Sequence, residues 1–287
     1  MTPGARLRRL LRQPEIVIAP GAWDGITARL IEQAGFGAAY MTGAGTSMAR
    51  GFPDFGLLTM DEMVSNAAVL ARSIAVPLIA DADTGYGNEL NVTRTVREFE
   101  SCDVAGIHIE DQVFPKRCGH LDGKDVIAKD EFVSKIRAAV AARRDPDFVI
   151  IARTDARAVT GFDDAVARAN AALDAGADMA FVEAVQTTEE LSGVPKQVKG
   201  PCLLNVVPGG KTPRVSFADA QALGYRLAIL PGLLLSAVMI AADRALQTVK
   251  ESGTTPEVPP SASVTDTFRR FGADEWNALR RQFASKA

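Results

Sequence analysis

The feature that most constrains the fold of this chain is the regular alternation of short β-type runs with amphipathic helical patterns. The helical segments carry apolar residues three and four positions apart, as Ile26, Leu30 and Ala34 do. Eight strands separated by helices are typical of a closed (β/α)8 TIM barrel, and they suit closure better than the competing layout, an open doubly wound sheet. We expect strands near residues 16–19, 38–41, 78–81, 106–110, 148–154, 179–183, 202–205 and 226–229, with helices over 23–34, 60–74, 91–101, 129–142, 162–175, 187–194 and 216–223.

The alternation ends near Leu246, which predicts one catalytic barrel domain over residues 1–246. Residues 251–264 are rich in Ser, Thr, Pro and Gly, a composition typical of a linker, and residues 266–283 have a helical pattern. We therefore expect residues 247–287 to form a linker and a C-terminal helical tail. The apolar face of the tail needs a partner surface, either a neighbouring subunit with which the helices are swapped or its own barrel. That face consists of Phe268, Phe271, Trp276, Leu279 and Phe283.

Composition excludes several classes of protein. The formal net charge of −3 gives no reason to expect nucleic acid as a partner. The three cysteines are widely spaced, which argues against a disulfide framework and for a reducing, cytoplasmic compartment. The longest apolar run, residues 227–242, is interrupted by Pro231 and Gly232, so we expect no membrane span. Residues 1–13 are basic with interleaved leucines, and an amphipathic helix that caps the fold is favoured over a transit peptide.

Polar residues gather where each expected strand ends, whereas the strand interiors are Val, Ile, Leu and Ala. In a barrel of this kind the carboxyl ends of the strands carry the functional groups. These side chains should therefore face one space at the mouth of the barrel. In chain order they are Tyr40, Thr42, Gly43, Ala44, Asp54, Asp81, Asp83, His108, Glu110, Arg153, Glu183 and Asn205.

Four of these residues are carboxylates, and they predict a metal site. Asp54, Asp81, Asp83 and Glu110 cannot all ionise in one small space without a counter-charge. Mg²⁺ suits such a site because it keeps several waters and takes few direct protein ligands. We expect Asp81 to bind directly and the other three to reach the metal partly through water.

Two further features of the mouth predict a small substrate rich in carboxylate oxygens. Arg153 offers a planar fork for a carboxylate. The backbone N–H groups of the small-residue turn at Thr42, Gly43 and Ala44 offer a place for a second anionic oxygen.

The loop after the fourth strand carries the sequence Lys116-Arg117-Cys118-Gly119-His120. The chain has only two histidines, His108 and His120, and both lie in this region. Cationic neighbours stabilise a thiolate, so we expect the pKa of Cys118 to be lowered. This loop is the predicted centre of the chemistry.

These segments resemble the isocitrate lyase/phosphoenolpyruvate mutase superfamily. Residues 19–24, 81–88 and 110–112 match family segments, and the resemblance extends to about residue 246. Residues 116–120 look like the signature of the lyase branch, whereas the phosphonate mutases and oxaloacetate decarboxylases of the family lack that cysteine.

The resemblance implies a Mg²⁺-dependent retro-aldol lyase, with Mn²⁺ as a substitute metal and a homotetramer with swapped C-terminal helices as the assembly. It implies that Cys118 lies on a mobile loop and protonates the carbanion, that Tyr40 assists at the 2-hydroxyl, and that Arg153 stabilises the developing charge. Lys116, Arg117 and His120 then tune the thiol and bind carboxylate oxygens. The substrate-binding set is Thr42, Gly43, Ala44, Asp81, Arg117, Gly119, Arg153, Glu183 and Asn205.

The substrate class follows from the loops after the seventh and eighth strands. Residues 206–213 look like the branch that contains dimethylmalate lyase and the petal death protein, and residues 231–237 contain no arginine for a third carboxylate. A 2-alkylmalate such as 2,3-dimethylmalate, cleaved to a 2-oxo acid and a carboxylate, is therefore favoured. Lys211 keeps 2-methylisocitrate, cleaved to pyruvate and succinate, open as an alternative. Two more functions stay open: hydrolysis of oxaloacetate to oxalate and acetate, and the role of a non-catalytic carboxylate-binding protein.

Overall fold

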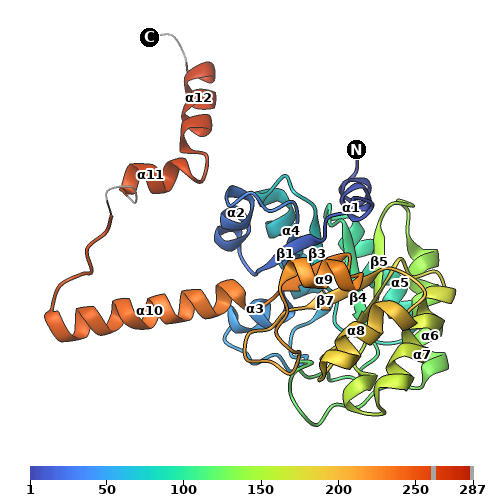
Figure 1. The fold of residues 1–287 in the computed structure, drawn as a ribbon. Coiled ribbons are helices and arrows are strands. Elements are labelled where there is room, and N and C mark those ends of the chain that lie inside the picture. Colours follow the sequence, from blue (N-terminus) through green and yellow to red (C-terminus); the bar gives the residue numbers. More distant parts are fainter. Residues whose placement is uncertain (260–262, 285–287) are drawn as a thin grey trace. The chain divides into compact units, whose positions relative to one another are not determined.

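The computed structural model describes residues 1–259 and 263–284, and a closed barrel of parallel strands forms its centre (Figure 1). Each strand pairs with the next in chain order, and the eighth pairs with the first. The predicted (β/α)8 barrel is therefore confirmed, and the open doubly wound sheet is excluded. The strands are β1 (Val17–Ala22), β2 (Ala39–Met41), β3 (Leu78–Asp81), β4 (Gly106–Glu110), β5 (Val149–Thr154), β6 (Met179–Val182), β7 (Cys202–Asn205) and β8 (Leu227–Leu230).

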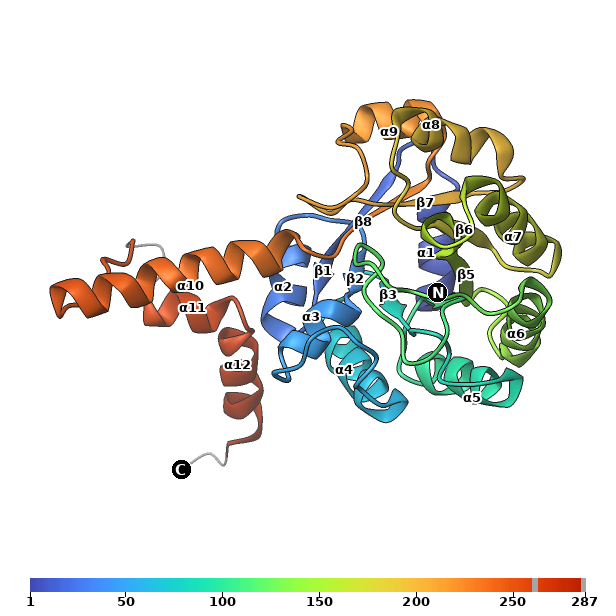
Figure 2. The same cartoon turned by 90° about the horizontal axis from the view of Figure 1, so that it is seen from below.

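Helices connect the strands and surround them as a ring, which Figure 2 shows from below. Side-chain caps fix where several of them begin. Asp24, Thr59 and Asn88 each accept a hydrogen bond from a backbone N–H of the first helical turn, and each forms a capping box. The surrounding helices are α2 (Gly25–Gln33), α4 (Met60–Ser73), α5 (Glu89–Glu100), α6 (Lys129–Ala142), α7 (Phe162–Asp174), α8 (Thr188–Gln197) and α9 (Phe217–Leu223).

Two short helices lie where the sequence predicts only loops. Helix α3 (Gly43–Met48) follows β2, and a single 3-10 turn, η1 (Ala156–Ala158), follows β5. Thr42 caps α3 by accepting a hydrogen bond from the N–H of Gly45. Both elements are too short to carry a periodic pattern, which explains why the sequence does not reveal them.

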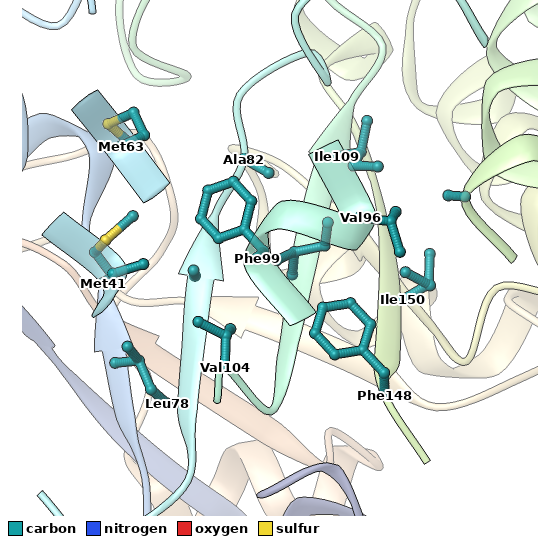
Figure 3. Packing of buried hydrophobic residues seen from close by; sticks show 14 of the residues in the cluster. Met41, Met63, Leu78, Ala82, Val96, Phe99, Val104, Ile109, Phe148 and Ile150 are labelled. Carbon is teal, nitrogen blue, oxygen red and sulfur yellow. The ribbon is translucent and has the colours of Figure 1, made fainter. Parts of the chain in front are cut away.

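The larger part of the core lies between the outer face of the strands and the helices. Figure 3 shows Leu78 of β3 and Ile109 of β4 facing Phe99 of α5 within one cluster of buried residues. Met41 of β2 and Met63 of α4 extend the same layer, and all five side chains are almost fully buried. This layer fixes the strands from outside and leaves their inner faces to define the site.

The amino end of the barrel is closed by helix α1 (Pro3–Leu11). Leu7 is fully buried and packs in one cluster with residues at the starts of strands, among them Val17, Val149 and Leu227. The Arg8 guanidinium donates to the carboxylate of Asp178 at 2.8 Å. Residues 1–13 thus include the capping helix that their amphipathic pattern predicts.

The end of the chain forms a second compact unit. The chain divides into units Met1–Leu235 and Ser236–Ala287, and α10 (Leu233–Ser252) contains both this division and the predicted boundary at Leu246. The predicted single tail helix is two helices, α11 (Val264–Arg269) and α12 (Ala273–Phe283), because Gly272 adopts a left-handed φ of 85° between them.

Most apolar residues of the tail are exposed in the structure, whereas Phe271 is half-buried. The exposed residues include Phe268, Trp276 and Phe283, while Leu279 is less exposed. The swapping of these helices between subunits stays a prediction. None of the described helices is long and apolar enough to cross a membrane.

We predict that Leu7→Ala weakens the fold from the end of the barrel opposite the site. The substitution removes a fully buried side chain from the closing helix, so the free energy of unfolding should fall by about 2–5 kcal/mol. Urea unfolding followed by circular dichroism measures this change. The exposed Arg9→Ala serves as control and should stay within about 0.5 kcal/mol of the parent. Equal stability of the two variants would contradict a structural role for α1.

Candidate active site

The inner face of the barrel changes from apolar to polar toward the carboxyl ends of the strands. Alternate residues of a strand share a face, so Asp81 lies directly above the buried Ile79 in β3. The same change occurs in β5, β6 and β7, from Ile151 to Arg153, from Phe181 to Glu183 and from Leu203 to Asn205. Strand register then brings the polar residues together, because Asp81 pairs with His108 and Glu110 pairs with Arg153.

These residues surround a cavity of about 160 Å³ at the mouth of the barrel. A larger cavity of about 360 Å³ lies within the loop after β7, but its lining, residues 206–209 and 212–215, includes no acid or thiol. We therefore take the smaller cavity as the candidate active site. The predicted residues that line it are Tyr40, Thr42, Ala44, Asp54, Asp81, Cys118, Gly119, His120, Arg153, Glu183 and Asn205. The other predicted site residues, Gly43, Asp83, Glu110, Lys116 and Arg117, lie outside this lining.

Asp81 is the best-positioned carboxylate of the cluster. Its side chain accepts hydrogen bonds from the N–H groups of Gly43 and Asp83, at 3.3 and 3.0 Å. Burial alone would raise the pKa of Asp81, but the nearby His108, Lys116 and Arg153 and the hydrogen bond from the Asp83 N–H outweigh it and lower the pKa to about 2. Asp81 is therefore ionised at neutral pH. Gly43 is needed at its position, because a Cβ there would lie 2.5 Å from the Asp81 carboxylate.

Lys116 holds the two other aspartates. Its Nζ lies 2.5 Å from Asp54 and 2.8 Å from Asp83, and its side chain is buried. Burial raises the pKa of Asp83 to about 6, and Lys116 opposes this rise only in part. The positive charge of Lys116 is thus offset by these two carboxylates, and it stabilises a thiolate at the neighbouring Cys118 less.

Glu110 is fully buried, and no hydrogen bond from the described residues reaches either of its carboxylate oxygens. Arg153 Nη1 lies 3.2 Å away, yet burial raises the pKa of Glu110 well above its usual value. An orphaned buried carboxylate of this kind fits a site that receives a cation.

The buried charges at the mouth point to the same need. Seven buried carboxylates stand against five buried lysines and arginines among the described residues: Asp54, Asp81, Asp83, Glu110, Asp111, Asp155 and Glu183 against Lys116, Lys124, Lys135, Arg153 and Arg168. At the same time, no three acidic, His or Cys side chains of residues 1–259 and 263–284 converge closely enough to bind one ion directly. The arrangement therefore suits a cation with few direct protein ligands and a largely aqueous coordination shell, which is the preference of Mg²⁺.

Arg153 is held rigidly by Asp155, a residue at the end of the same strand to which the sequence analysis gave no role. Asp155 accepts hydrogen bonds from Arg153 Nε and Nη2 at 2.9 and 3.2 Å, and its own N–H donates to Asp111 at 2.8 Å. The guanidinium also lies 5.2 Å from the centre of the Phe181 ring. The guanidinium group of Arg153 is therefore fixed in orientation. It faces the cavity, and some of its N–H groups already donate to Asp155.

His108 is a second residue that the sequence analysis left without a role. It is fully buried, and its Nε2 lies 2.8 Å from the Tyr40 hydroxyl and 3.5 Å from Asp81 Oδ1. Burial lowers the pKa of His108 to about 4, so the ring is neutral at pH 7. His108 and Glu110 are two residues apart in β4 and therefore share the inner face of the barrel, which can be read from the sequence. His108 orients the hydroxyl of Tyr40 at the edge of the acidic cluster.

Cys118 is a protonated thiol in this site. Burial and the nearby Asp54 carboxylate raise the pKa of Cys118, so the expectation of a lowered pKa is wrong. The physical reason is that the flanking cations are engaged elsewhere, since Lys116 pairs with two carboxylates and Arg117 lies over the ring of Phe55, 5.4 Å from its centre. A half-buried, protonated thiol suits proton donation better than nucleophilic attack.

His120 joins the loop of Cys118 to two other segments, those of Glu183 and Lys211. Its Nε2 lies 3.1 Å from Glu183, whose carboxylate also accepts hydrogen bonds from Asn205 at 3.1 and 3.2 Å. The N–H of Lys211 donates to His120 Nδ1 at 3.0 Å, and Lys211 Nζ pairs with the exposed Asp122 at 2.5 Å. The loops after β4 and β7 therefore meet over the cavity.

Comparison with known proteins gives a consistent picture of the whole chain. Residues 7–250 match the family model described as phosphoenolpyruvate phosphomutase. The 2,3-dimethylmalate lyase of Eubacterium barkeri is 45% identical over 280 residues, which are 97% of this chain and 94% of that protein. The 2-methylisocitrate lyase of Aeropyrum pernix is 43% identical, over 89% of this chain and 82% of that protein.

Solved structures agree closely with the fold of this chain. Oxaloacetate acetylhydrolase in complex with the inhibitor 3,3-difluorooxalacetate has a TM-score of 0.95 at 36% identity, covering 100% of this chain and 98% of that one. A crystal structure of 2,3-dimethylmalate lyase, described as a PEP mutase/isocitrate lyase superfamily member, has a TM-score of 0.94 at 41% identity, covering 100% and 97%. Phosphonopyruvate hydrolase in complex with oxalate and Mg²⁺ has a TM-score of 0.89 at 32% identity, covering 99% of each chain.

We predict that the reaction of Cys118 with iodoacetamide follows an unusually high pKa. The reagent attacks the thiolate, and a raised pKa keeps the thiol protonated through neutral pH, so the rate should continue to rise with pH beyond the midpoint of the unfolded protein. Peptide mass spectrometry of the native protein and of the protein in urea measures the two pH profiles. A plateau of the native rate below about pH 8, under the ordinary cysteine range, would show a stabilised thiolate instead.

Proposed function

Since the chain belongs to the phosphoenolpyruvate mutase/isocitrate lyase superfamily, we propose that it is a metal-dependent carbon–carbon lyase acting on a 2-hydroxy dicarboxylate. The favoured substrate is a 2-alkylmalate such as 2,3-dimethylmalate, cleaved between C2 and C3 to a 2-oxo acid such as pyruvate and a carboxylate. The observation that carries this proposal is a protonated thiol, Cys118, at a cavity whose floor holds a cluster of buried carboxylates.

The acidic cluster would hold the metal. Asp81 is the proposed direct ligand, because it is ionised and lines the cavity, while Asp54, Asp83 and Glu110 contribute partly through water. A bound Mg²⁺, or Mn²⁺ in its place, polarises the 2-hydroxyl and its carboxylate and offsets negative charge as the bond breaks. Lys116 keeps Asp54 and Asp83 in place by its two ion pairs.

The remaining residues of the mouth orient the substrate. Arg153, fixed by Asp155, presents its guanidinium to a carboxylate, and His120 and Asn205 position Glu183 beside it. Tyr40, with its hydroxyl held by His108, is placed to hydrogen-bond the 2-oxygen near Asp81. Thr42, Gly43, Ala44, Arg117 and Gly119 complete the proposed binding set.

The chemistry ends with a proton transfer. The 2-hydroxyl gives its proton to a carboxylate of the acidic cluster, and the freed electron pair forms the C2 carbonyl as the C2–C3 bond breaks. The electron pair of the broken bond stays on C3, next to a carboxylate. The Cys118 thiol donates its proton to C3 and releases the second carboxylate product. Its raised pKa keeps the proton on sulfur until the carbanion forms.

The charge around the cavity supports a dicarboxylate. Lys211, the candidate partner of a third carboxylate, pairs with Asp122 outside the cavity, and the rim beside it is formed by Val207, Pro231 and Leu235. Apolar rim residues suit alkyl substituents. The 43% identity to a 2-methylisocitrate lyase keeps that tricarboxylate as an alternative, and the fit to oxaloacetate acetylhydrolase keeps hydrolysis of oxaloacetate as another.

The assembly and the compartment are also part of the proposal. The exposed apolar residues of α11 and α12 support a homotetramer with swapped C-terminal helices. Three free cysteines support a reducing cytoplasmic location.

We predict that the protein with Mg²⁺ releases a 2-oxo acid from 2,3-dimethylmalate faster than from 2-methylisocitrate. A lactate dehydrogenase-coupled assay over both acids measures pyruvate, and chromatography for oxalate tests oxaloacetate separately. Faster release from 2-methylisocitrate would favour the tricarboxylate, and oxalate from oxaloacetate would favour the hydrolase. No turnover of any of the three acids by folded, Mg²⁺-loaded protein would overturn the lyase proposal.

In the same assay Cys118→Ser should lower kcat by about 10²–10⁴-fold, because a hydroxyl is a far weaker acid in that position. Cys102→Ser is the matched control, since Cys102 follows α5 and lies outside the cavity lining. Mg²⁺ binding should survive both substitutions. A Cys118→Ser variant that keeps full activity would remove the thiol from the mechanism.

We predict that Asp81→Asn weakens Mg²⁺ binding at least about tenfold, because it removes the proposed direct ligand. Isothermal titration calorimetry and the rise in Tm on adding Mg²⁺ both measure this effect without turnover. Asp122→Asn is the control, since its carboxylate is exposed and pairs only with Lys211 among the described residues. Equal Mg²⁺ affinity of Asp81→Asn and the parent protein would place the metal elsewhere.

A further inference from the structure

Lys124 is a buried lysine at the end of the loop that carries Cys118. Lysine on a loop normally extends into water, yet only 1% of this side chain is exposed. It does not line the cavity, and none of the proposed steps uses it. A buried ammonium group without a catalytic role requires another explanation.

The first contact of Lys124 is with the main chain of the reactive loop. Its Nζ donates to the carbonyl oxygen of Gly119, which lies between Cys118 and His120. Gly119 itself lies against the barrel, since a Cβ there would be 2.5 Å from both Arg153 Nη2 and Glu183 Oε1. Lys124 therefore binds the loop at a residue that lies directly against Arg153 and Glu183.

The second contact of Lys124 is with the barrel. Its Nζ lies 3.4 Å from Asp155 Oδ1, the same carboxylate that orients Arg153 through two hydrogen bonds. Asp155 is anchored in turn, because its N–H donates to Asp111. The ammonium group thus bridges a fixed point at the end of β5 and the carbonyl of Gly119 on the loop.

Lys124 is not needed to balance the charge of Asp155, because Arg153 already forms a bidentate ion pair with that carboxylate. The bridge to Gly119 is what the lysine adds. Other contacts also hold the loop, among them Cys118 N–H to the Asp54 carbonyl, His120 to Glu183, and Lys211 to His120 and Asp122. Lys124 differs from Cys118 and His120 in that it does not line the cavity. Lys124 can therefore act on the position of the loop without touching the substrate.

We propose that Lys124 is a latch: a positioning residue that holds the loop of Cys118 against the barrel by joining the Gly119 carbonyl to Asp155. The latch rests on the proposed function only for its effect on turnover, since its effect on the loop is measurable without substrate. Because a proton donor displaced by about 1 Å can lose about 10²-fold in rate, loosening the latch should lower kcat.

The test replaces the ammonium group and keeps the apolar stem. In Lys124→Met, kcat for the accepted substrate should fall by about 10²-fold. The same variant should leave Cys118 less protected, so that iodoacetamide labels it about tenfold faster at one pH, with or without Mg²⁺ and oxalate. Lys129→Met, the same substitution at an exposed lysine at the start of α6, is the matched control and should behave as the parent.

Lys124→Gln provides a second variant, which keeps a donor for the Gly119 carbonyl and should have an intermediate labelling rate. Labelling of Cys118 at the parental rate in folded Lys124→Met would overturn the latch, as would failure of both Lys124 variants to fold while Lys129→Met folds. The proposed lyase function is judged separately. If Cys118 of Lys124→Met is labelled faster but the parent protein turns over none of the acids, the latch is kept and the lyase function is rejected. If the parent protein turns over an acid but labelling of Lys124→Met is unchanged, the lyase function is kept and the latch is rejected.

Discussion

The crowding of carboxylates at one end of the barrel is the constraint on which the rest of the site depends. Burial makes each negative charge costly, and the lysines and arginine within reach are too few to balance them. The cluster survives because Lys116 pairs with Asp54 and Asp83. The remaining carboxylates, Glu110 and Asp81 among them, are the basis of the divalent cation site that we propose at the mouth.

The same constraint explains why Cys118 keeps its proton, which suits the role of proton donor that we propose for it. Cationic neighbours in the sequence indicate a thiolate, but in the folded chain these cations are consumed by acids and by an aromatic ring. Asp54 then faces the sulfur as a negative neighbour, and burial acts in the same direction on the pKa of Cys118. An acid that holds its proton until a carbanion appears is what cleavage next to a carboxylate requires.

The sequence was sufficient to predict the barrel and most of the cavity lining, because both follow from periodicity. Eight βα units determine closure, and residue parity in each strand places Asp81, Arg153, Glu183 and Asn205 on the inner face. The roles of Asp155 and His108 depend on side-chain partners from other strands, which periodicity does not reveal. The break in the tail at Gly272 depends on a single left-handed residue within an otherwise helical pattern.

The choice between two and three carboxylates on the substrate follows from where the cations lie. Each buried carboxylate needs a partner with matched geometry. Removing an unpaired charge from water costs more free energy than its attraction to a distant opposite charge recovers. In the proposed site, the metal and Arg153 provide for two carboxylates. A third carboxylate would have to draw the Lys211 ammonium group from Asp122, which lies on the same loop as Cys118. The proposed dicarboxylate, with its alkyl groups against Val207 and Leu235, leaves that ion pair in place.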